Sequence, residues 1–95
     1  PVDLKAFLKT LAHPEDPVLM LKEASLLLHG LSPAQETFDS LKATLLTGQD
    51  KDHYWTDAWM EYLSDPTNSE AILTVENRLK PVFQRLLQLG ETYLM

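Results

Sequence analysis

The sequence predicts an all-α protein, and three observations support that fold class. Leucine occurs 19 times among 95 residues, whereas valine and isoleucine together occur five times. Leucine keeps most of its side-chain freedom in a helix, and β-branched residues lose more of theirs. No stretch alternates polar and apolar residues as a half-buried strand does, but several repeat apolar residues every three or four positions. We therefore expect one domain over residues 1–95, folded as a compact bundle of about five helices.

The first two expected helices each begin at an aspartate. Asp3 precedes a short helix that Pro14 ends, with an apolar face of Leu4, Phe7, Leu8 and Leu11. Asp16 followed by Pro17 is a strong start signal for the second helix, and Gly30 is a left-handed stop. Its apolar face is wide and consists of Met20 or Leu21, with Ala24, Leu27, Leu28 and Leu31. Such a width predicts that neighbours cover this helix on more than one side.

Capping boxes mark the starts of two further helices. Ser32 with Gln35 predicts the start of the third helix, which ends at Gly48 and carries an apolar stripe of Ala34, Phe38, Leu41 and Leu45. A polar loop over residues 48–53 leads into a fourth helix with Trp55, Trp59, Tyr62 and Leu63 on one face, terminated by Asp65-Pro66. Thr67 with Glu70 is the second box, and it starts the last helix.

The last helix is expected to be long and kinked near Pro81. Its apolar residues keep a 3.6-residue period straight through that proline, which favours one bent helix over two separate ones. Gly90 is the expected end, followed by a tail of residues 93–95.

The charge balance excludes some partners. Fourteen acidic and eight basic residues give a net charge of −6, which argues against binding to nucleic-acid backbones. No apolar run approaches the roughly 20 residues that a membrane span needs. Residues 48–70 contain six acidic residues and one basic residue, so the fourth helix is expected to present an acidic outer surface. We interpret this surface as a solvated face, with a docking patch for a basic partner as the alternative.

Few residues offer reactive chemistry. The absence of cysteine excludes disulfides, thiolate zinc sites and a cysteine nucleophile. The three histidines, His13, His29 and His53, lie too far apart in sequence for a local zinc motif. Asp50, Asp52 and Glu61 match three ligand positions of a calcium loop, but Trp55 occupies the position that requires glycine. Ser25 and His29 lie one helical turn apart without a third catalytic group. We therefore expect no metal, cofactor or catalytic residue in this chain, and no enzymatic activity of its own.

The aromatic residues of the fourth helix allow two interpretations. An aromatic stripe at helical spacing is typical of a core. The alternative is an exposed groove, in which a helix-binding adaptor uses a partner surface of Trp55, Trp59, Tyr62, Asp57 and Glu61.

Asp39-Ser40-Leu41 resembles the Asp-Ser-Leu core of acyl carrier proteins, where the serine bears phosphopantetheine. The resemblance implies a carrier modified at Ser40. Carriers place this serine at the start of a helix, whereas Ser40 is expected eight residues past the Ser32 cap.

A broader pattern consists of Trp55-Thr56, Trp59, Tyr62-Leu63, the stretch 65–68 and the chain end 91–95. With Leu26-Leu27-Leu28 and Leu31-Ser32, it resembles the C-terminal part of the bacterial family known as domain of unknown function 1800, of the Bacteroidetes type, over roughly residues 17–95. The resemblance implies the C-terminal helical portion of a longer, exported protein and brings no catalytic residues. We expect a structural or interaction module whose partner is the rest of its parent chain or another protein.

Overall fold

A computed structural model describes the backbone of residues 3–94 and the side chains of residues 3–89. Over this range the chain forms five helices and no strand, so the expected all-α fold is confirmed. The helices are α1 (Leu4–Lys9), α2 (Pro17–His29), α3 (Gln35–Leu45), α4 (His53–Ser64) and α5 (Ser69–Leu94). None of these five helices is both long and apolar enough to cross a membrane.

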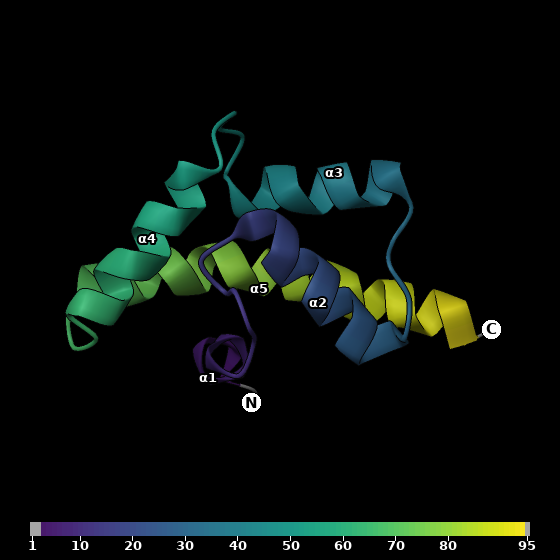
Figure 1. Ribbon diagram of the computed structural model, residues 1–95, viewed down its shortest axis with the longest axis horizontal. Coiled ribbons are helices and arrows are strands. Elements are labelled where there is room, and N and C mark those ends of the chain that lie inside the picture. Colours follow the sequence, from purple (N-terminus) through teal and green to yellow (C-terminus); the bar gives the residue numbers. More distant parts are fainter. Residues whose placement is uncertain (1–2, 95) are drawn as a thin grey trace.

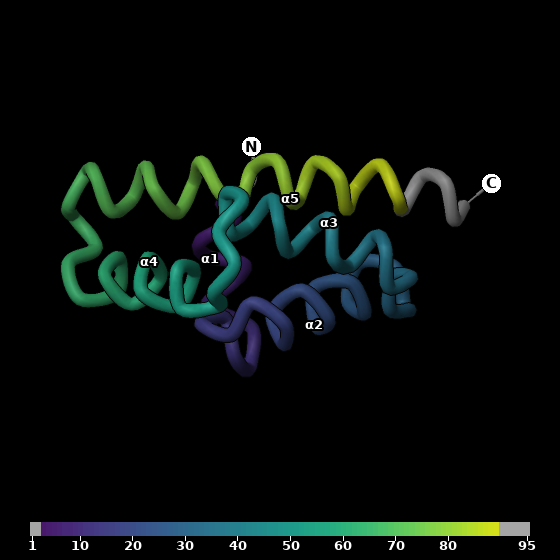
Figure 2. Tube along the Cα trace, turned by 90° about the horizontal axis from the view of Figure 1, so that it is seen from above, coloured from purple at the N-terminus to yellow at the C-terminus, as the bar shows by residue number. Residues whose placement is uncertain are grey.

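Helix α5 is the element around which the bundle is organised. It runs along the longest dimension of a molecule that measures 41 × 30 × 21 Å, and the other four helices all pack against it (Figures 1 and 2). Helix α4 folds back along the first half of α5, α2 and α3 flank its second half, and α1 crosses the bundle nearly end-on in Figure 1. Each of the other four helices therefore contacts this one long helix.

The buried side chains form one continuous core. It draws on all five helices and on the turns that follow α1 and α3, and its members are Leu8, Leu11, Met20, Leu21, Ala24, Leu41, Leu45, Leu46, Trp55, Trp59, Tyr62, Ala71, Val75, Leu79, Val82, Phe83 and Leu86. The largest of these side chains come from α4, where the two tryptophans stack with ring centroids 5.9 Å apart. Leu63, expected on the same face, is exposed, and the smaller Ala58 is buried beside the tryptophans instead.

The aspartate caps and the glycine stop of the first two helices are present as expected. Asp3 Oδ1 accepts hydrogen bonds from the backbone N–H groups of Lys5 and Ala6. Asp16 Oδ1 accepts from Val18 N–H at 2.9 Å and from Leu19 N–H at 3.0 Å. Gly30 adopts φ of 74°, a left-handed conformation that glycine tolerates without steric cost.

The two expected capping boxes do not form. Helix α3 begins at Gln35, so Ser32 lies two residues before the N-cap and cannot reach the helix, and the Gln35 side chain donates to Asp39 instead. At the start of α5 the cap moves by one residue. Asn68 Oδ1, rather than the Thr67 hydroxyl, accepts from the N–H groups of Glu70 and Ala71. A capping box requires a spacing of three from the N-cap, and neither helix begins where that spacing demands.

The difference between a formed and an unformed cap can be measured. Asp16→Ala is expected to lower the free energy of unfolding by about 1 kcal/mol, because two N–H groups lose their acceptor. Ser32→Ala is expected to change it by less than about 0.5 kcal/mol. Urea unfolding followed by circular dichroism compares the two variants, and equal losses would show that the Ser32 box does form.

Helix α5 continues through Pro81 as a single helix of 26 residues, in agreement with the uninterrupted apolar period (Figure 2). The expected end at Gly90 is wrong, because the helix runs on to Leu94. Within the expected tail, residues 93 and 94 are therefore helical, and Met95 lies outside the described residues. Helix α3, in contrast, ends at Leu45, before its expected stop at Gly48. Gly48 closes the turn that follows by donating its N–H to Ala43 O.

Helix α2 packs against both α3 and α5, as its wide apolar face predicts, but this cover does not reach the C-terminal end of the helix. The first half of α2 is buried through Met20, Leu21, Ala24 and Ser25. Beyond that point Leu27 is 62% exposed, Leu28 39% and Leu31 43%. Helix α1 crosses the bundle nearly end-on in Figure 1 and does not run along α2, so it does not cover this end of α2.

Candidate interaction surface

The structure divides the five residues of the expected partner surface between the core and the solvent. Trp55, Trp59 and Tyr62 are buried, whereas Asp57 and Glu61 are exposed on the outer side of α4. The indole N–H of Trp55 donates to Pro14 O at 2.9 Å, so this ring also fixes the turn between α1 and α2. The aromatic face of α4 is therefore part of the core, and the alternative of an exposed groove on this face is wrong.

The polar candidates lie apart from one another. His13 approaches Glu15 at 3.6 Å, His53 contacts Asp57 at 3.1 Å, and His29 is bonded to the backbone of α5. Within the described residues, no three histidine or carboxylate side chains come together as a metal site would require. Ser40 lies exposed in the middle of α3, where its carbonyl accepts a hydrogen bond from the Thr44 hydroxyl.

Ser25 is buried rather than available as a nucleophile. Its side chain is 1% exposed, and its Oγ has no hydrogen-bond partner among the described residues. A buried hydroxyl without a partner costs about 1–3 kcal/mol of desolvation.

Removing that hydroxyl is expected to stabilise the protein. Ser25→Ala is expected to raise the free energy of unfolding by about 1 kcal/mol, beyond the few tenths that alanine gains from helix propensity. Ser40→Ala is the matched control, because it makes the same change at an exposed position in the middle of a helix. Both are measured by thermal and urea unfolding. A gain no larger at position 25 than at position 40 would show that the buried hydroxyl is not a liability.

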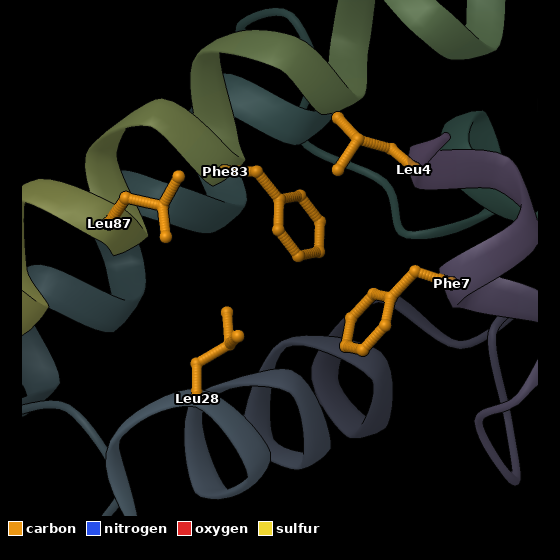
Figure 3. Close-up of a pocket in the computed structure, with 5 residues that line it drawn as sticks. All are labelled: Leu4, Phe7, Leu28, Phe83 and Leu87. Atoms are coloured by element: carbon orange, nitrogen blue, oxygen red, sulfur yellow. The ribbon is translucent and has the colours of Figure 1, made fainter. Parts of the chain in front are cut away.

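A pocket opens where α1, α2 and α5 meet, and the described side chains that line it are all apolar. Leu4 and Phe7 from α1, Leu28 from α2, and Phe83 and Leu87 from α5 point into a space of about 140 Å³ (Figure 3). Phe7 and Phe83 meet edge to face, with ring centroids 5.7 Å apart, and form one end of the space. We call this pocket the α2/α5 groove; Leu27 and Leu31, near the C-terminal end of α2, are also exposed.

The two main walls of the groove are held together by a hydrogen bond beside the pocket. His29 Nε2 lies 2.7 Å from Leu86 O. Each of these residues is the direct neighbour of a lining residue, since Leu28 precedes His29 and Leu87 follows Leu86. A carbonyl oxygen can only accept, so Nε2 carries the proton in this contact. The bond fixes the end of α2 against α5, and the groove is preformed.

The cation nearest to the pocket-lining residues is paired with two carboxylates. Lys5, next to Leu4, lies 3.4 Å from Asp3 and 3.4 Å from Glu76. Burial acts to lower the pKa of Lys5, but the negative charges of Glu76 and Asp3 outweigh it, and the pKa is raised. The backbone N–H of Ala6 and the Lys5 ammonium hold the pKa of Asp3 below its usual value.

The sequence contained one signal for this surface, the wide apolar face of α2. A wide apolar face predicts contact with several neighbours. The same pattern of apolar residues arises, however, when part of the face extends beyond those neighbours and stays exposed. The partners of Leu28 across the pocket come from residues 4–7 and 83–87, and no local spacing connects these segments.

Comparison of this chain with protein-family models, curated proteins and solved structures found no match.

Proposed function

We propose that this chain is a non-catalytic helical module that binds another polypeptide through the α2/α5 groove. The observation that carries the proposal is a pocket whose described lining residues are all leucine or phenylalanine, two of which, Leu28 and Leu87, are 39% and 59% exposed. Contiguous exposed apolar surface is typical of interaction sites in proteins that keep a closed core elsewhere.

The energetic argument rests on the exposed leucines. Leu28 and Leu87 leave much of their surface in water, although α2 and α5 each bury a full core face. Complete burial of one leucine contributes about 1.5–3 kcal/mol, so covering the groove would supply several kcal/mol for association. Binding at the groove would require no rearrangement of the core, because the hydrogen bond between His29 and Leu86 already sets the distance between α2 and α5.

The proposal includes a position within a longer protein. The resemblance of residues 17–95 to the end of the family known as domain of unknown function 1800 supports a C-terminal module of an exported bacterial protein. In that setting, the polypeptide that covers the groove belongs to the parent chain or to its partner.

The absence of cysteine allows a direct test of whether the groove is covered in the cell. Leu87→Cys places a thiol at the pocket, and Leu73→Cys places one on the same helix at nearly the same exposure, 56% against 59%. Maleimide labelling rates are compared between the purified 95-residue chain, checked for helicity by circular dichroism, and the gene product inside the cells that produce it. We expect position 87 to be protected at least about tenfold in cells and position 73 to label equally in both settings. Equal rates at position 87 in both settings contradict the proposal.

A further inference from the structure

We draw no further inference here: the strongest candidate, the apolar pocket where α1, α2 and α5 meet, belongs to the surface already described, and nothing in the part of the chain that the structure describes shows what covers it.

Discussion

Replacing Trp55 by alanine is expected to lower the free energy of unfolding by about 3–5 kcal/mol, the largest loss that a single substitution in this chain should produce. The Trp55 side chain is fully buried and stacks on Trp59. Its indole N–H also donates to Pro14 O, and the neighbouring Thr56 hydroxyl donates to Glu15 O at 2.7 Å. Truncation therefore leaves a cavity in the core and also frees part of the turn that positions α1 and α2.

Two further variants separate these contributions. Trp55→Phe keeps an aromatic ring but loses the N–H donor, and it is expected to cost less than the alanine variant, about 1–3 kcal/mol. Tyr54→Ala is the control, because Tyr54 is the adjacent residue in α4 and its ring is 38% exposed. All are measured by urea unfolding followed by circular dichroism. A loss for Trp55→Ala no greater than that for Tyr54→Ala would contradict the buried position of the indole.

Replacing Pro81 by alanine is expected to raise the free energy of unfolding by about 1–3 kcal/mol. Proline inside a helix costs roughly 3 kcal/mol, because it lacks an N–H donor and its ring crowds the preceding turn. Alanine restores a backbone donor toward Asn77 O at an exposed position of α5. Greater freedom of the unfolded chain offsets about 0.4–1 kcal/mol of this gain.

The control for Pro81→Ala is Pro66→Ala, which lies in the turn between α4 and α5, outside any helix. There only the unfolded chain gains freedom, so a small loss of stability is expected. Thermal unfolding compares both variants with the parent chain. A loss of stability for Pro81→Ala would contradict this prediction. It would show that the packing of α5 holds the backbone in a conformation that accommodates proline.

Much of the fold could be predicted from the sequence, because local signals and tertiary packing agree there. Asp16-Pro17 and Gly30 mark the two ends of α2 within one residue of where they lie. The apolar period of α5 predicts its core on both sides of Pro81, since Val75, Leu79, Val82, Phe83 and Leu86 are all buried, and Ile72 at its start is partly buried. The capping boxes failed for different reasons, because α3 begins two residues after the position that Ser32 predicts, at an N-cap of Ala34, whereas Asn68 takes the cap of α5 in place of Thr67. Asn68 is as good a cap as Thr67, and only the backbone conformation decides between them.

The candidate site was harder to predict, because it consists of apolar side chains that the other helices leave exposed. Leu27 and Leu28 have the spacing of core residues, but they are exposed. The aromatic residues of α4 are buried, as the preferred interpretation of the stripe predicts, and the alternative of a partner surface on this face fails. A groove between segments that are over seventy residues apart in the chain has no local pattern.

The most direct measurement is methyl NMR of the leucine side chains in the presence of a soluble paramagnetic agent. Strong broadening of the Leu28 and Leu87 signals, with sharp signals from Leu21 and Leu79 in the core, is the result expected for an open apolar groove beside a closed core. Nuclear Overhauser contacts from the Leu28 methyls to the Phe7 or Phe83 ring should accompany it. Equal protection of Leu28, Leu87 and the core leucines in the monomer would contradict the groove itself.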